Sequence, residues 1–270
     1  MSGGVLSPET LMAAADDKIR TLIKQVDRED LALHNEGYAP EGDLFDQLVA
    51  PERARYVLAL RMLEGLPPGR AVDLGCFFPY MPILLTALGW QVTAVDRYSL
   101  FGPSVHEALV AMARAEGFEL LDLDMTTDLH RIGEADLILL MAVVEHLNGS
   151  PLALMQNIAG LLGPRRGNLL LEVPNIATLW HRLQFLRGTS PLPDYGSYLR
   201  SSYPFAGHNR EMTGGEVRML LEASGYAIDK LFLFDYSPPA PGLKPALLRL
   251  AQRAVPSCRE TIMAVARPRG

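Results

Sequence analysis

The stretch Ala71-Val72-Asp73-Leu74-Gly75-Cys76 indicates the fold of this chain. A short apolar run that ends at a glycine is typical of a buried strand followed by a sharp turn, because glycine adopts backbone conformations that other residues avoid. The cluster Gly65-Leu66-Pro67-Pro68-Gly69 stands just before it and interrupts any preceding helix. We therefore expect the first strand of a sheet at residues 71–74.

Downstream of this strand, apolar runs alternate with helical segments. The expected strands are 91–96, 118–122, 135–143 and 168–173, and the expected helices between them are 80–89, 104–116 and 150–163. The run 135–143 is almost entirely apolar, as a strand that is buried on both faces should be. Repeated strand–helix units of this size predict an α/β fold with a doubly wound, Rossmann-like parallel sheet.

The flanking regions depart from this alternation. Residues 1–50 are expected to form a helical and loop segment that covers the site, with an amphipathic helix at 8–26, and a main domain follows at 51–266. Within it, 176–207 is rich in aromatic residues and proline, which suggests a small cap insertion. The last predicted elements are a helix at 213–225 opened by a capping box, strands at 226–235 and 260–266, and a helical stretch at 243–254 between these strands.

Composition excludes several classes of protein. The chain has 270 residues, of which 49% are apolar and 21% charged, which is ordinary for a globular protein and not for a disordered, collagen-like or coiled-coil one. With 25 basic against 31 acidic residues the net charge is −6, so no nucleic-acid partner is expected. Two cysteines, the lack of a signal-peptide pattern and the short apolar runs predict a cytoplasmic protein without stable membrane insertion.

Candidate ligand-binding residues follow the strands, because ligands of open parallel sheets bind beyond the carboxyl ends of the strands. Gly75 allows a close approach of the backbone to a ligand after the first strand. Asp96 ends the second strand, where a carboxylate can accept hydrogen bonds from both hydroxyls of a ribose. Asp122 and Asp124 follow the third strand, and Glu145 and His146 follow the fourth.

In this order the motifs resemble those of the class I S-adenosylmethionine-dependent methyltransferases, in particular the type 11/23 branch. The resemblance rests on Val72-Asp73-Leu74-Gly75-Cys76, Val95-Asp96, Asp122/Asp124, Val144-Glu145-His146-Leu147 and His208-Asn209-Arg210-Glu211-Met212-Thr213. It covers about residues 50–266 and implies a seven-stranded sheet, mostly parallel, with an antiparallel C-terminal strand. The implied cofactor is S-adenosyl-L-methionine.

The resemblance also implies roles for individual residues. Asp73 and Gly75, with Cys76 and Phe77 in the same loop, would lie next to the methionine and ribose of the cofactor, and Asp96 would bind the ribose hydroxyls. Asp124 with Met125 would meet the adenine, with Asp122 as the other candidate for that edge. Met141 and Ala142 would line the methionine end.

Catalysis is expected to depend on histidine. Transfer to a neutral oxygen requires a base, and the pKa of histidine lies near the working pH. We expect His208 to act on the substrate as the base, and Glu145 and His146 to lie near the transferred methyl group or to support that loop. Glu145 and His146 could join a site for a divalent ion, but two ligands are too few to assign one, so no metal is assigned.

The acceptor is expected to be a small molecule or a glycan precursor, methylated at oxygen, with the cap closing its pocket. His181, Arg182, Arg187 and Arg200 in the cap are candidates for contact with an anionic group. An alternative is a non-catalytic binding protein of the same fold, because the family usually has glycine at the positions of Phe77 and Pro79. A nicotinamide-dependent reductase lacks support, since the loop after the first strand holds a single glycine.

Overall fold

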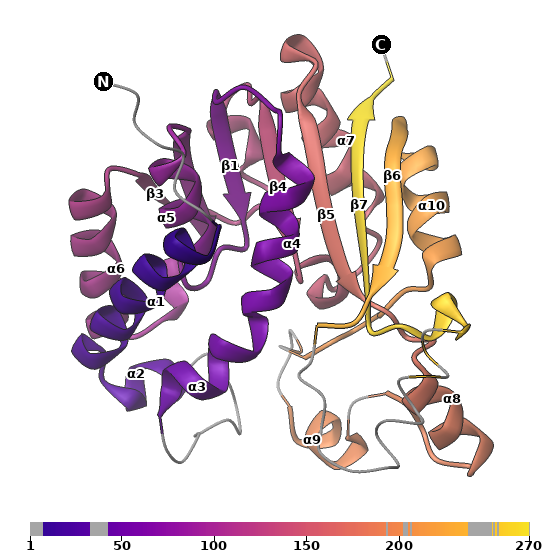
Figure 1. The fold of residues 1–270 in the computed structure, drawn as a ribbon. Helices are drawn as coiled ribbons and strands as arrows, with labels where there is room; N and C mark the ends of the chain where they lie inside the picture. The colour runs from indigo at the N-terminus through magenta and orange to yellow at the C-terminus, as the bar shows by residue number, and fades with distance from the viewer. Residues whose placement is uncertain are drawn as a thin grey trace. The chain divides into compact units, whose positions relative to one another are not determined.

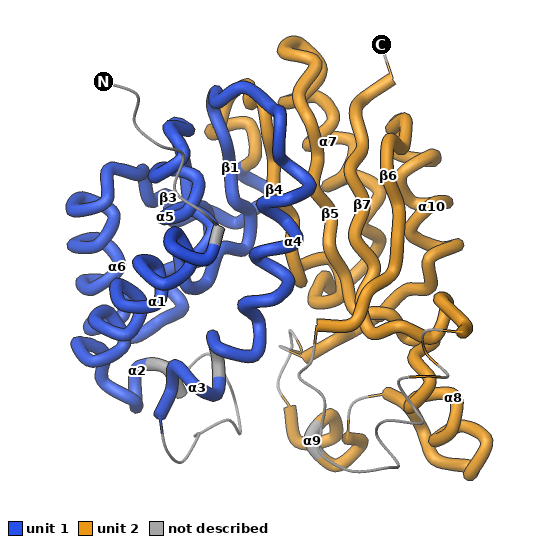
Figure 2. The backbone as a smooth tube through the Cα atoms, viewed as in Figure 1, with its two compact units in different colours: residues 1–128 blue, residues 129–270 orange. Residues whose placement is uncertain are grey.

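Seven strands form a mixed sheet in the order β3-β2-β1-β4-β5-β7-β6 in a computed structural model of the chain (Figure 1). The structure describes residues 8–32, 43–192, 194–201, 205, 207–236, 250, 252 and 254–269. The order reverses between β1 and β4, as in a doubly wound sheet, which confirms the predicted fold class. The chain divides into two compact units, residues 1–128 and 129–270, which Figure 2 colours separately.

The first unit contains three parallel strands: β1 (Arg70–Leu74), β2 (Gln91–Asp96) and β3 (Glu119–Asp122). In their register Leu74 lies beside Val95, and Asp96 lies beside Asp122. The carboxyl ends of neighbouring strands therefore lie side by side. The helices of this unit are α1 (Pro8–Gln25), α2 (Arg28–Ala32), α3 (Leu44–Leu48), α4 (Arg53–Leu63), α5 (Tyr80–Ala87) and α6 (Pro103–Glu116).

The second unit contains β4 (Leu137–Met141), β5 (Asn168–Pro174), β6 (Tyr226–Phe234) and β7 (Thr261–Pro268). β4 and β5 are parallel, whereas β7 runs antiparallel to both β5 and β6. The predicted antiparallel C-terminal strand is thereby confirmed. The helices of this unit are α7 (Leu152–Leu162), α8 (Leu179–Leu186), α9 (Tyr195–Arg200) and α10 (Gly214–Ala223).

Local sequence explains several of these elements. All five residues of β4 are buried, which accounts for the apolar run that predicted it. Gly117 ends α6 at a φ of 82°, in the left-handed region that favours glycine. At α10 the predicted capping box is present, because the Thr213 hydroxyl accepts from the amide of Glu216 and the Glu216 carboxylate accepts from the amide of Thr213.

Some predicted boundaries are wrong. The main domain, expected from residue 51, opens with a short 3₁₀ helix, η1 (Ala50–Glu52), and α4 begins only at Arg53. The fourth strand ends at Met141, two residues earlier than predicted, because Ala142 takes a φ of +54° and leaves the extended conformation. Residues 33–42 of the predicted helical and loop segment, and most of the helical stretch expected at 243–254, lie outside the described residues. Among the described helices, none is long and apolar enough to cross a membrane.

Candidate functional site

The loop after β1 is held against the end of β2. The amides of Gly75 and Cys76 both donate to the carbonyl of Val95, at 2.8 Å and 3.2 Å. Gly75 has a φ of 75° and Phe77 a φ of 46°, so two residues of this tight turn lie in the left-handed region. Phe77 therefore adopts the backbone conformation that glycine takes most readily. The turn keeps a glycine-like course although the side chain is large.

Asp96 fastens this loop through its carboxylate. Its Oδ2 accepts from the amide of Phe77 at 2.8 Å, and its Oδ1 accepts from the amide of Arg97 at 2.7 Å. An ionised carboxylate offers about four lone-pair sites, so each oxygen can accept a further hydrogen bond. Asp96 thus shapes the turn, and its predicted contact with a ribose stays a prediction.

Asp73 is a buried acid, only 6% exposed, beside the same loop. Burial raises the pKa of Asp73 to about 7, and the charge of Asp96 adds to this, while a hydrogen bond from Cys76 and the positive charge of Arg55 oppose it. The carboxyl group therefore changes its protonation state near neutral pH. Asp73 is identified from the sequence, but Arg55 is not. Arg55 lies on α4, so it does not follow a strand in the sequence as most of the other candidates do.

The thiol of Cys76 is packed and unreactive. Burial raises its pKa well above the ordinary value, and the carboxylates of Asp73 and Asp96 raise it further. Cys76 is 8% exposed and belongs to no disulfide. It can line a ligand site, but the structure gives it no features of a nucleophile.

Asp124 takes part in a turn after β3. Its Oδ1 accepts from the amide and the hydroxyl of Thr126, at 2.9 Å and 2.6 Å, and its Oδ2 lies 3.7 Å from Arg97. These hydrogen bonds lower the pKa of Asp124. Met125 next to it is half-buried. The predicted contact of this pair with adenine stays a prediction.

A second group of predicted residues gathers after β4, within the second unit. Met141 is the buried last residue of β4, and Ala142 turns the chain with its amide donating to the carbonyl of Glu172 at 2.9 Å. The 3₁₀ helix η4 (Val144–His146) follows at once. It places Glu145, which is fully buried, next to half-buried His146.

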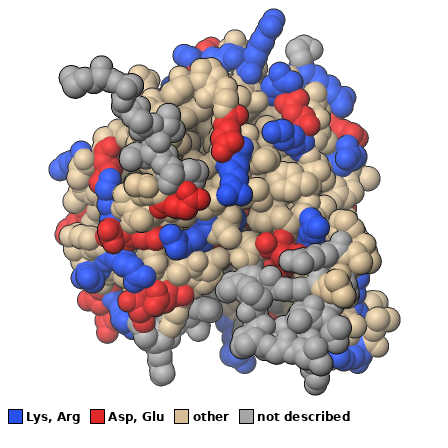
Figure 3. All heavy atoms as spheres, viewed as in Figure 1, with Lys and Arg blue, Asp and Glu red and all other residues tan. Residues whose placement is uncertain are grey.

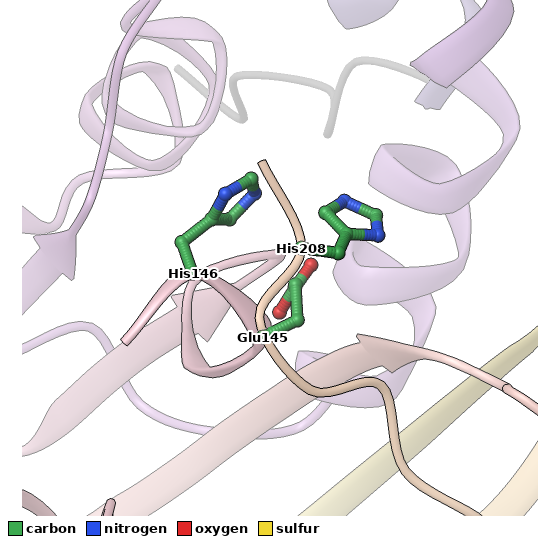
Figure 4. A group of neighbouring side chains, drawn as sticks. All are labelled: Glu145, His146 and His208. Carbon is green, nitrogen blue, oxygen red and sulfur yellow. The ribbon is translucent and has the colours of Figure 1, made fainter. Parts of the chain in front are cut away.

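His208 joins Glu145 and His146 from a distant part of the sequence. Figure 4 shows the three side chains converging, two from η4 and one from the loop before α10. One ligand atom from each lies within 4.8 Å of the others. The rings of His146 and His208 meet edge to face, with centroids 4.8 Å apart. The structure therefore brings together all three residues predicted to be catalytic.

Backbone hydrogen bonds hold this arrangement in place. The amides of Asn209 and Arg210 both donate to the carbonyl of Glu145, at 2.7 Å and 3.1 Å. The side-chain amide of Asn209 donates to the carbonyl of His146 at 3.0 Å. The loop that carries His208 is thereby attached directly to η4.

Glu211 is the residue of this group that sequence reasoning missed. Its Oε1 lies 2.7 Å from Nδ1 of His208, and its side chain is only 13% exposed. Burial alone would lower the pKa of His208, but the hydrogen bond to Glu211 and the charges of Glu145 and Glu211 outweigh it, so the net shift is upward. The signal was present in the sequence, since Glu211 follows His208 by three residues and belongs to the quoted motif.

The cap insertion carries α8 and α9 beyond the carboxyl end of β5 (Figure 1). It exposes several large apolar side chains. They lie on α8, on α9 and between the two helices: Trp180, Phe185, Leu186, Leu192, Tyr195, Tyr198 and Leu199 are all more than half exposed. A mainly apolar depression on α8 is lined by Ile176, His181, Arg182, Phe185, Leu186 and Pro191. Arg182 is partly engaged, because its guanidinium donates to the carbonyls of Ala177 and Ser257.

Comparison with known families places the chain in one of them. A family model described as a methyltransferase domain matches residues 48–231. The chain belongs to this methyltransferase family. The match confirms the predicted resemblance to the S-adenosylmethionine-dependent methyltransferases. No curated protein matches the chain.

Solved structures share the fold at low sequence identity. Magnesium protoporphyrin IX methyltransferase from Synechocystis PCC 6803, solved with bound S-adenosylhomocysteine, has a TM-score of 0.53 at 14% identity, with 94% of this chain and 100% of that chain covered. An S-adenosylmethionine-dependent methyltransferase from Clostridium acetobutylicum has a TM-score of 0.53 at 12% identity, with 84% of this chain and 95% of that chain covered. The Burkholderia thailandensis 1,6-didemethyltoxoflavin N1-methyltransferase has a TM-score of 0.51 at 17% identity, with 100% of this chain and 94% of that chain covered.

Proposed function

We propose that this methyltransferase uses S-adenosylmethionine to methylate an oxygen of a small molecule or glycan precursor. The observation that carries the proposal is the pairing of His208 with Glu211 beside Glu145 and His146. A protein that only binds its ligand has no need of an oriented proton acceptor, whereas transfer to a neutral hydroxyl does.

The cofactor would be held by the loop after β1 and by the acidic residue at the end of β2. Gly75, Cys76 and Phe77 supply the turn, and the Asp96 carboxylate would accept hydrogen bonds from the ribose hydroxyls. Asp73 would face the cationic methionine end, while Asp124 with Met125 would border the adenine. Met141 and Ala142 keep their predicted role at the methionine end of the cofactor.

At the acceptor end, His208 is suited to remove a proton. An ionised carboxylate only accepts hydrogen bonds, so the bond to Glu211 fixes the proton of a neutral His208 on Nδ1 and leaves the lone pair on Nε2. Bound S-adenosylmethionine would supply the methyl group to the acceptor oxygen, and Nε2 of His208 would take up the proton that the acceptor hydroxyl loses. S-adenosylhomocysteine is the leaving group. Glu145 and His146 would position the acceptor beside this atom.

The surface of the cap favours an acceptor with an apolar part. Exposed aromatic side chains such as Trp180, Phe185 and Tyr195 offer flat contact area. On the face shown in Figure 3, basic and acidic side chains are interspersed among the described residues and do not gather into a basic patch. This arrangement gives little support to a nucleic-acid acceptor. Two of the solved relatives are named for porphyrin and toxoflavin-type substrates, which are small molecules.

One residue favours a second candidate function, that of a binding protein without catalysis. Phe77 stands where the family usually has glycine, and its ring packs against Phe78 and Phe101 with centroid distances of 4.4 Å and 5.5 Å. A ring at this position reduces the space for a cofactor. Against this candidate, the backbone of Phe77 keeps a glycine-like φ and its amide still reaches Asp96.

Calorimetric titration with S-adenosylhomocysteine tests the cofactor site. We expect micromolar binding by the natural protein and at least a tenfold weaker affinity in Asp96→Ala, because the ribose acceptor and the anchor of the loop are both lost, at about 1.4 kcal/mol per factor of ten. Glu107→Ala removes an exposed acid from α6 in the same unit and should bind normally. If the folded natural protein does not bind the ligand, the non-catalytic reading replaces the enzymatic one.

A further inference from the structure

We propose that Glu145, His146 and His208 bind a divalent transition-metal ion through one carboxylate oxygen and two imidazole nitrogens. Their ligand atoms lie within 4.8 Å of one another, so an ion between them would be within about 3 Å of each. Small side-chain rotations would bring these distances to about 2.1 Å, the usual length for zinc–imidazole bonds. Two imidazoles with a carboxylate suit Zn²⁺, Fe²⁺, Co²⁺ and Ni²⁺ better than Mg²⁺ or Ca²⁺, which prefer oxygen.

The hydrogen bond between His208 and Glu211 is the second observation that points to a metal. Histidines that bind metals commonly donate their other ring N–H to a carboxylate, which fixes the tautomer and makes the ligating nitrogen more basic. Glu211 occupies this position at 2.7 Å from Nδ1 of His208, so the remaining ligand atom is Nε2. Glu211 would thus orient the His208 ring from the side away from the ion.

The charges around the site also favour a cation. Glu145 and Glu211 contribute two carboxylates that are fully or largely buried, and the two histidines are neutral when they bind a metal. Arg210 pairs with Glu216 at 2.8 Å, and Nδ1 of His181 lies 2.9 Å from the carbonyl of Ile176 and 3.9 Å from Glu211. A divalent ion would compensate the two carboxylates.

The site is built before an ion arrives. Glu145 and His146 come from one rigid 3₁₀ turn, and three hydrogen bonds from Asn209 and Arg210 attach the loop of His208 to it. Preorganised ligands lose little conformational entropy on binding, which favours affinity. Three protein ligands leave coordination positions open, as in catalytic rather than structural metal sites.

The consequence for the reaction rests on the proposed function. An acceptor hydroxyl that fills an open position would have its pKa lowered by the ion and would lose its proton to water. His208 cannot bind an ion and accept a proton through the same Nε2. In the loaded enzyme the ion therefore takes over the task that His208 performs as a base in the metal-free enzyme.

Titration of the chelator-treated protein with Co²⁺ and Zn²⁺ tests the site. We expect one ion to bind per chain with micromolar or tighter affinity, and bound Co²⁺ to give visible absorption bands. The His146→Ala and His208→Ala variants should lose metal binding and the Co²⁺ bands. Glu211→Gln should weaken metal binding 10- to 100-fold, as typically happens when a metal-binding histidine loses its hydrogen-bonded carboxylate. His130→Ala removes an exposed histidine of the same unit and should change nothing.

Two results would overturn the proposal: no stoichiometric binding by the natural protein, or binding that persists in both histidine variants. S-adenosylhomocysteine affinity, measured on the same samples, separates this failure from a failure of the proposed function. A protein that binds S-adenosylhomocysteine but no ion overturns the metal site and leaves the proposed function standing. A protein that binds the ion but not S-adenosylhomocysteine does the reverse.

Discussion

Replacing His208 with alanine is expected to lower kcat by about 10²- to 10⁴-fold, the range typical for loss of a general base. The reason is local. Glu211 holds His208 in the tautomer whose Nε2 is unprotonated, and the loop that carries it is attached to η4 by hydrogen bonds from Asn209 and Arg210. The measurement is methyl transfer to an accepted substrate, with S-adenosylhomocysteine binding determined on the same protein. The affinity for S-adenosylhomocysteine should stay within about twofold of the natural value, because His208 is proposed to act at the acceptor end. A twofold change in affinity corresponds to about 0.4 kcal/mol.

Two matched variants sharpen this test. His130→Ala removes an exposed histidine of the same unit and should keep full activity. His208→Gln keeps a polar side chain of similar reach but has no basic nitrogen, so it should be as inactive as the alanine variant. The assays are run with and without chelator, because a loss confined to metal-containing buffer indicates a ligand role. A His208→Ala enzyme with unchanged kcat would remove this histidine from the mechanism.

Much of the fold is readable from the sequence because its signals are local. The apolar run of β4 reflects burial on both faces, and the capping box at Thr213 is a contact between residues three apart. Gly117 marks the end of α6 because only a few residues adopt a positive φ readily. Such features depend on near neighbours in the chain and are visible without a structure.

The parts that could not be predicted depend on contacts between distant residues or on exceptions to local rules. Glu145 and His208 are 63 positions apart in the sequence, so their convergence follows from the sheet and not from any spacing. Ala142 and Phe77 adopt positive φ values without being glycine, which no propensity predicts. Both are themselves candidate cofactor-binding residues, and strained backbone tends to cluster at functional sites.

The second large effect is expected at Asp73, where Asp73→Asn should stabilise the protein in alkaline buffer. Burial raises the pKa of Asp73 to about 7, far above the value of about 3.9 expected in the unfolded chain. The folded state then binds more protons than the unfolded state between these two values, so stability falls as pH rises through this window. At pH 8 the ionised carboxylate costs on the order of a few kcal/mol, and below pH 4 the cost disappears because both states are protonated.

The measurement is the free energy of unfolding of the natural protein and of Asp73→Asn across this pH range. The variant should be more stable at pH 8 and nearly equal near pH 4. Asp17→Asn, which alters an exposed acid on α1 in the same unit, serves as the control and should be neutral at both values. Equal stability of Asp73→Asn and the natural protein at pH 8 would show that the buried carboxylate carries no such cost.

If Asp73 binds the cofactor, Asp73→Asn should stabilise the protein but weaken ligand binding, because a buried charge without a ligand is unfavourable and a bound cation compensates it. S-adenosylmethionine carries a sulfonium and an ammonium group, so its binding should favour the ionised form of Asp73. Binding at pH 6 should therefore release a proton, seen as an enthalpy that depends on the ionisation enthalpy of the buffer. Asp73→Asn should lose this proton release and bind at least tenfold more weakly. Unchanged affinity and proton release in the variant would place the methionine end of the cofactor away from Asp73.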